Sequence, residues 1–171
     1  MNKPQFGHDL SRVTREHYIT GKAAINFPSS GGTTGGWHSI AYFDRDSGVL
    51  KLSVAGIHYP DTMVFFADAG IFDATPSLVK RGWPVEGLTI YMADHFRAAA
   101  DMVVRWALSD SQHCNVEIAE WFPAAPDRQR FLDLLASGTP GLQELGGSTK
   151  WEPGCATRLA EVRRGLVADW M

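Results

Sequence analysis

The residues best suited to proton transfer in this chain are His58 and Asp61, three positions apart. A histidine titrates near neutral pH, and a nearby carboxylate can orient its ring, so the pair could act as general acid and base. His38 is a third candidate for the same chemistry. The competing interpretation, which the local pattern favours, is that Asp61 caps the element that follows and His58 is a partly buried turn residue.

A segment without charge, residues 28–36, could contact a ligand. It contains four glycines and four hydroxyl side chains, and it ends directly at Trp37. Backbone N–H groups of such a segment can cradle an anion, but no lysine follows the glycines, and a strand rather than a helix is expected next, which excludes the phosphate-binding and dinucleotide-binding motifs. The simplest interpretation is a flexible hairpin loop. The alternatives are a flap over a ligand and an arm that contacts another subunit. The ligand-binding candidates are Ser29, Ser30, Thr33, Thr34, Trp37, His58 and His95.

Other motifs of catalysis or metal binding do not occur in the sequence. It has no HExxH, no histidine pair at i,i+4, no Cys/His pair at zinc spacing and no GxSxG. His113 and Cys114 are adjacent, so one strand would direct them to opposite faces. A lone histidine such as His95 is more often a satisfied core residue than a ligand. We therefore expect no metal and no cofactor.

Composition narrows the class of partner. The net charge is −3, so the chain has no basic excess to neutralise phosphates, and we expect neither nucleic-acid nor membrane binding. Two cysteines, Cys114 and Cys155, make no disulfide framework, and no apolar run is long enough to span a membrane; a cytoplasmic location is expected. Six tryptophans in 171 residues suggest that some line a pocket or a subunit contact, and a homodimer is the favoured assembly.

The periodicity predicts strands first and helices afterwards. Alternating apolar residues predict strands over 17–27, 37–44 and 49–57. A turn at 45–48 would pair Phe43 with Leu50 and Ala41 with Leu52, which places Trp37 and His58 on the core face beside the glycine-rich segment. Residues 61–69 fit either a helix or a strand. A strand over 114–121 is also predicted.

The helical half of the pattern centres on residues 88–108, which carry one apolar stripe at 3.6-residue spacing. Asp94, Arg97, Asp101 and Arg105 form the opposite, polar face of that predicted helix. Shorter helices are predicted over 75–82, 126–136 and 156–170, with a short helical turn from Thr139 to Gly146. Residues 1–12 are expected to be a flexible N-terminal arm, and residues 13–171 a single domain.

These elements predict an α+β fold: a small antiparallel sheet of three or four strands, formed as an N-terminal meander and packed by about four helices. The leading functional hypothesis is a small-molecule-binding protein without catalysis, with an aromatic-lined pocket near the glycine-rich segment. The first alternative is an enzyme that uses His58 and Asp61. The second is a protein–protein interaction module.

Overall fold

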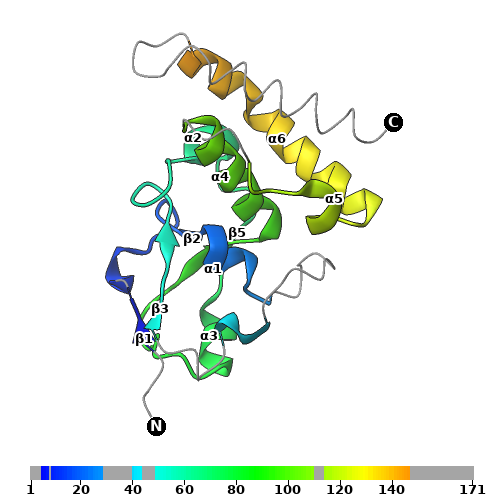
Figure 1. The fold of residues 1–171 in the computed structure, drawn as a ribbon. Coiled ribbons are helices and arrows are strands. Elements are labelled where there is room, and N and C mark those ends of the chain that lie inside the picture. The colour runs from blue at the N-terminus through cyan, green and yellow to red at the C-terminus, as the bar shows by residue number, and fades with distance from the viewer. Residues whose placement is uncertain (1–4, 8, 29–39, 44–48, 110–113, 147–171) are drawn as a thin grey trace.

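The computed structural model describes residues 5–7, 9–28, 40–43, 49–109 and 114–146 (Figure 1). These residues contain a four-stranded sheet, a separate strand pair and six α-helices, so the predicted α+β class is confirmed. In chain order the elements are β1 (Gln5–Phe6), η1 (Leu10–Arg12), β2 (Ile19–Thr20), α1 (Gly21–Ile25), η2 (Ile40–Phe43), β3 (Val49–Leu50), β4 (Ser53–Val54), α2 (Met63–Phe66), β5 (Ile71–Asp73), α3 (Thr75–Lys80), β6 (Tyr91–Ala93), α4 (His95–Ala107), α5 (Ile118–Trp121) and α6 (Ala125–Gly146).

The four-stranded sheet is mixed and has the order β4-β2-β6-β5. Ile19 of β2 pairs with Val54 of β4 in antiparallel fashion and with Met92 of β6 in parallel fashion. β5 pairs antiparallel with β6. The N-terminal meander predicted from the sequence is therefore wrong, because the two central strands, β2 and β6, are about seventy residues apart in the chain.

The observed strand is shorter than the strand predicted over 17–27, because Gly21 turns the chain. Only Ile19 and Thr20 are in β2, and α1 begins at Gly21, which has φ +63°. This left-handed conformation suits glycine. A Cβ at Gly21 would also lie 2.6 Å from the Tyr59 hydroxyl, so both the backbone and the packing require glycine here.

Among the described residues, the predicted pairing of Phe43 with Leu50 and of Ala41 with Leu52 does not form. Phe43 lies in the 3-10 turn η2, while Leu50 belongs to β3, which pairs in parallel with β1, so Phe43 and Leu50 are not strand partners. Pairing with distant strands replaces this local pairing, and it buries Leu50, Leu52 and Val54. Within the predicted N-terminal arm, β1 and η1 form and Leu10 is buried in the core, while the division into an arm and a single domain stays a prediction.

The predicted helix over 88–108 divides at Asp94. Residues Tyr91–Ala93 form β6, and α4 covers only His95–Ala107. The division occurs because the Asp94 carboxylate caps the helix by accepting from the backbone N–H of Arg97 at 2.8 Å. The central helix is thus present but begins seven residues later than predicted, since the preceding apolar residues complete the sheet.

The later predictions are confirmed in part. Residues 61–69, left open between helix and strand, contain helix α2, and α3 lies within the predicted helix 75–82. The predicted strand over 114–121 is wrong, because residues Ile118–Trp121 form helix α5. The predicted helix 126–136 and the helical turn after it form one helix, α6, which continues through Gly138. The predicted helix over 156–170 lies outside the described residues.

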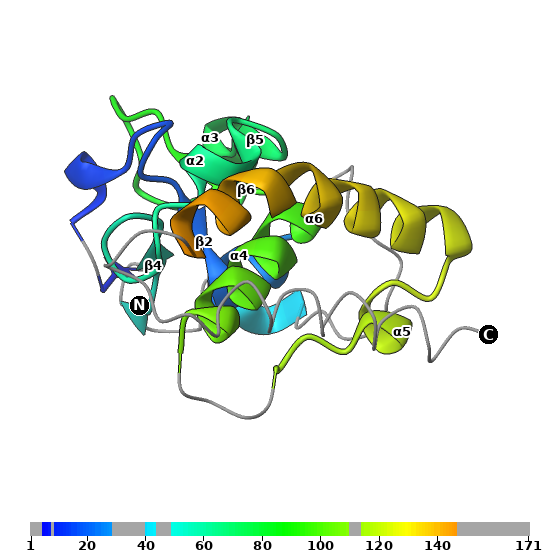
Figure 2. The ribbon, with the colours of Figure 1, turned by 90° about the horizontal axis from the view of Figure 1, so that it is seen from above.

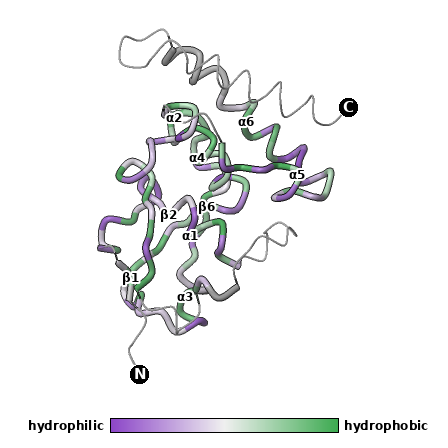
Figure 3. Tube along the Cα trace, in the orientation of Figure 1, coloured by the Kyte–Doolittle hydropathy of each residue, from purple (hydrophilic) through white to green (hydrophobic). Residues whose placement is uncertain are grey.

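Two apolar clusters lie on either side of α4. The larger cluster joins the sheet with α1, α3 and the strand pair, and includes Tyr18, Ile19, Phe27, Phe43 and Trp83. The second cluster joins α2, α4, α5 and α6. In Figure 2, seen from above, α6 crosses the α2 and α4 layer. Hydrophobic colouring gathers where α2, α4 and α6 approach one another (Figure 3).

Candidate functional site

His58 and Asp61, the predicted acid–base pair, are each engaged by the backbone of their own segment. The Nδ1 atom of His58 accepts from the N–H of Val54 at 3.1 Å, and the Asp61 carboxylate accepts from the N–H of Met63 at 3.0 Å. Both side chains are exposed. The Asp61 contact is the capping contact that the competing interpretation predicts, whereas His58 is exposed rather than partly buried.

His95, a predicted ligand-binding residue, is the first residue of α4 and is almost completely buried. Its Nε2 atom lies 2.9 Å from the carbonyl oxygen of Phe27. A carbonyl oxygen can only accept, so Nε2 carries the proton in this contact. The side chain therefore holds the end of the α1 segment against α4 and has the character of a satisfied core histidine.

The two ends of the glycine-rich region meet in the core. The rings of Phe27 and Phe43 form an edge-to-face contact with centroids 4.9 Å apart, and each side chain is 1 % exposed. The indole N–H of Trp83 donates to the carbonyl oxygen of Phe43 at 3.0 Å. Together with the bond from His95 to Phe27, this contact ties Phe27 and Phe43 to the core.

The remaining predicted site residues lie outside the described part of the chain. These are Ser29, Ser30, Thr33, Thr34, Trp37 and His38. The predicted neighbourhood of Trp37 and His58 was derived from the hairpin register. Because Phe43 and Leu50 are not strand partners, that register does not place Trp37 and His58 on one face.

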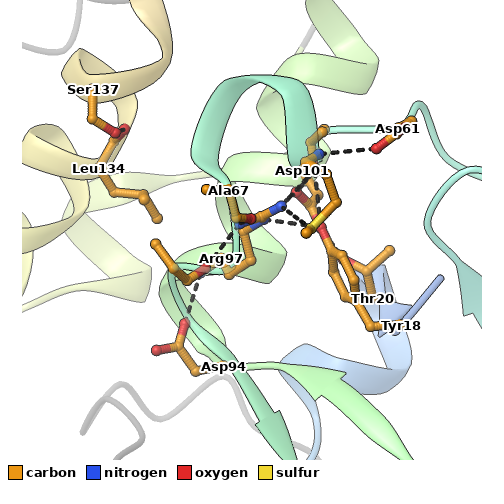
Figure 4. A network of polar contacts seen from close by, with 12 residues as sticks. Tyr18, Thr20, Asp61, Ala67, Asp94, Arg97, Asp101, Leu134 and Ser137 are labelled. Atoms are coloured by element: carbon orange, nitrogen blue, oxygen red, sulfur yellow. Dashed lines mark hydrogen bonds and ion pairs between the residues drawn. The ribbon is translucent and has the colours of Figure 1, made fainter. Parts of the chain in front are cut away.

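The sequence interpretation missed a buried polar network around Arg97 and Asp101 (Figure 4). The two residues were assigned to the polar, outer face of a helix, and that assignment is wrong, because both side chains are fully buried. The Nε atom of Arg97 donates to Asp101 Oδ1 at 3.0 Å and to the Tyr18 hydroxyl at 2.9 Å. The i,i+4 spacing was visible in the sequence, but it is equally typical of exposed helix pairs.

Asp101 receives hydrogen bonds from four donors. Besides Arg97, the hydroxyl of Thr20 donates to Oδ2 at 2.6 Å, that of Tyr18 to Oδ2 at 2.9 Å, and that of Thr62 to Oδ1. A carboxylate offers about four lone-pair positions, so its acceptor capacity is filled. Tyr18 and Thr20 belong to the β2 segment and Thr62 to the start of α2, so the three hydroxyls join two segments to α4.

Arg97 uses the rest of its guanidinium to hold a turn. Its Nη1 atom donates to the carbonyl oxygens of Ala67 and Ala69, both at 2.8 Å, and Nη2 donates to Thr62 at 3.2 Å. The guanidinium also lies over the rings of Tyr18 and Phe66, with its carbon 5.1 and 5.2 Å from their centroids. These contacts compensate the loss of hydration that burial of the cation imposes.

Burial changes the titration of this network. Complete burial raises the pKa of Asp101, and the opposing effects of Arg97 and the hydroxyl donors do not cancel the rise. Burial, with the neighbouring Asp101 carboxylate, raises the pKa of the Tyr18 phenol well above its usual range. Because the network is fully buried and internally saturated, its chemistry is structural: it joins the two apolar clusters across α4.

Aromatic side chains in the described part of the chain supply the core. Every one of them is buried or half-buried, including Trp83, which is 3 % exposed and packs on Phe6 at 4.5 Å between ring centroids. Trp37, Trp151 and Trp170 lie outside the described residues. Of the described tryptophans, Trp106 and Trp121 are half-buried.

Within the described residues, no group of three or more His, Cys, Asp or Glu side chains is arranged to hold a metal ion. Among the helices described, none has both the length and the apolar character needed to cross a membrane. In comparisons with protein-family models, curated proteins and solved structures, the chain matches none.

Proposed function

We propose that the protein binds a small molecule, without catalysis, at the glycine-rich region between Phe27 and Phe43. The observation that carries this proposal is that both flanking residues, Phe27 and Phe43, are anchored in the core. Their rings are in contact. The side chains of His95 and Trp83 form hydrogen bonds with their carbonyl oxygens. Binding residues in proteins are often carried by connecting segments whose flanking residues are held on a rigid scaffold.

The chemistry of the segment suggests the class of ligand. Ser29, Ser30, Thr33 and Thr34 offer hydroxyl groups, Trp37 offers an aromatic face, and residues 28–36 carry no charge. Hydroxyls and a tryptophan together suit a neutral polar molecule with a flat or apolar face, such as a sugar or a nucleoside. An anion would receive no charged partner from these residues.

The acid–base enzyme has less support. The Nδ1 atom of His58 already accepts a backbone N–H, and the carboxylate of Asp61 caps the start of α2. The protein–protein interaction module also has less support, because the described aromatic residues serve the core. A homodimer stays a prediction, and light scattering on a size-exclusion column measures it directly.

A thermal-shift screen tests the proposal. The probes are neutral monosaccharides, disaccharides and nucleosides, each in large excess. A ligand present at one hundred times its dissociation constant stabilises the folded state by about 2.7 kcal/mol. For a chain of this size that corresponds to a rise in melting temperature of about 5–10 °C.

The variants separate the proposed site from the rest of the surface. Trp37→Ala and Thr33→Ala should abolish or reduce the shift that a hit produces, whereas Ser137→Ala, which removes an exposed hydroxyl on α6, should leave it unchanged. The proposal fails if no probe stabilises the protein. It fails equally if every hit acts on Trp37→Ala as strongly as on the original chain.

A further inference from the structure

The feature that suggests a conformational device is the turn between α2 and β5, residues 67–70. Ala67 has φ +46° and ψ −136°, a backbone conformation that non-glycine residues rarely adopt, and Gly70 has φ +73°. Such strain persists only where surrounding contacts hold it. Here the holder is Arg97, whose Nη1 atom bonds to the carbonyl oxygens of Ala67 and Ala69.

Phe66, the residue before this turn, contacts both sides of the structure. Its ring lies beside the Arg97 guanidinium, with 5.2 Å from the guanidinium carbon to the ring centroid. It also lies against Gly138 of α6 so closely that a Cβ added there would overlap the ring. The ring therefore links the buried network to α6.

The described side chains of α6 dock chiefly on two helices through one apolar cluster. In the described part of the chain, α6 packs chiefly on α2 and α4, and its buried residues belong to the second apolar cluster. A half-exposed contact adds to this: Arg130 of α6 forms an ion pair with Asp94 at 3.2 Å and lies over the Phe96 ring. Regions joined through one small cluster often open as a unit while the remainder stays folded.

We propose that the turn 67–70 is a latch that couples the Arg97 network to the docking of α6. While Arg97 holds the turn, Phe66 is presented to Gly138 and α6 is docked. When the contacts that position Arg97 weaken, the turn relaxes and Phe66 moves away from Gly138. Helix α6 then opens while the sheet stays folded.

Hydrogen exchange of the intact protein, measured residue by residue, tests the latch. Thr62→Val keeps the shape of the side chain but removes the acceptor for Arg97 Nη2 and the donor to Asp101. Exchange of the α6 amides from Phe131 to Gly138 should rise by about tenfold, which corresponds to about 1.4 kcal/mol, relative to the β6 amides. The matched control is Thr75→Val, which removes one hydrogen bond to the Ile90 N–H, away from α6.

A second variant acts in the opposite direction. Ala67→Gly relieves the strain of the docked turn, so exchange of the same α6 amides should fall several-fold, again with little change in β6. This variant decides the question alone if Thr62→Val does not fold. The latch is refuted if Thr62→Val accelerates α6 and β6 equally, if Thr75→Val accelerates α6 as much, or if Ala67→Gly leaves α6 exchange unchanged.

Discussion

The guanidinium of Arg97 and the carboxylate of Asp101, one helical turn apart on α4, form an ion pair at 3.0 Å with both side chains fully buried. A buried pair contributes little net stability compared with well-packed apolar residues, but removal of one partner leaves an uncompensated charge. Its hydrogen bonds fix the relative positions of β2, α2 and α4.

Removal of either Arg97 or Asp101 should lower the free energy of unfolding. Asp101→Ala leaves Arg97 buried without its counter-ion, so the free energy of unfolding should fall by about 3–5 kcal/mol. Arg97→Met should cost a similar amount for the converse reason. In urea unfolding followed by circular dichroism, the double variant should lose less than the two single losses together. Losses that add within about 0.5 kcal/mol would contradict coupling of the pair.

Gly138 should resist substitution although it lies inside a helix. Alanine normally stabilises a helix interior by about 1 kcal/mol relative to glycine, but here the new Cβ would overlap the Phe66 ring. Because overpacking costs about 1–3 kcal/mol, Gly138→Ala should lower the free energy of unfolding by about 1 kcal/mol. In a Phe66→Leu background the ring is absent, and the same substitution should be stabilising. If Gly138→Ala still lowers the free energy of unfolding in the Phe66→Leu background, the Phe66 ring is not the cause of the destabilisation.

Stability should fall in alkali because of Tyr18. Burial raises the pKa of the folded-state phenol above the value near 10 of the unfolded chain. A group with a raised folded pKa contributes its full stability below the unfolded pKa and loses it as pH rises beyond that value. Above pH 10, Tyr18 should therefore remove up to about 1.4 kcal/mol of stability for each pH unit. Chemical denaturation at pH 9, 10 and 11 measures the slope. Tyr18→Phe should show a shallower decline, and an equal slope in both proteins would contradict the assignment.

Cys114 should react slowly with alkylating reagents. Burial raises the pKa of its thiol, and the thiolate is the reacting species. At pH 7.5 in native buffer, iodoacetamide should modify Cys114 several-fold more slowly than in urea, as measured by mass spectrometry of its peptide. A native rate equal to that in urea would mean that the thiol is not shielded from the reagent and that its pKa is not raised.

Features with a short-range cause were predicted well. The helical part of α4 followed from its apolar stripe, and α3 followed from Pro76 at its first turn and Gly82 after its end. The order of strands and helices was sufficient for the α+β class. Each of these signals depends on residues within one or two turns of one another, where steric and hydrogen-bond preferences act without the rest of the chain.

The predicted strand pairs and much of the candidate site required information from distant residues. The local pattern predicts that Leu50 pairs with Phe43, but in the structure Leu50 pairs with Phe6 of β1. His95 was a candidate ligand residue, and only the position of the Phe27 carbonyl shows that it anchors the core. His58 and Asp61 are close in sequence, yet the backbone N–H groups of Val54 and Met63 engage them separately.

The clearest division between sequence and structure is the face of α4 that carries Arg97 and Asp101. The sequence by itself determined that the two side chains share one helix face, because their spacing is four residues. Only the tertiary structure decided that this face is buried, because burial of two charges is tolerable only where other groups replace water. Those groups are the hydroxyls of Tyr18, Thr20 and Thr62 and the carbonyl oxygens of the turn, and folding alone brings them to α4.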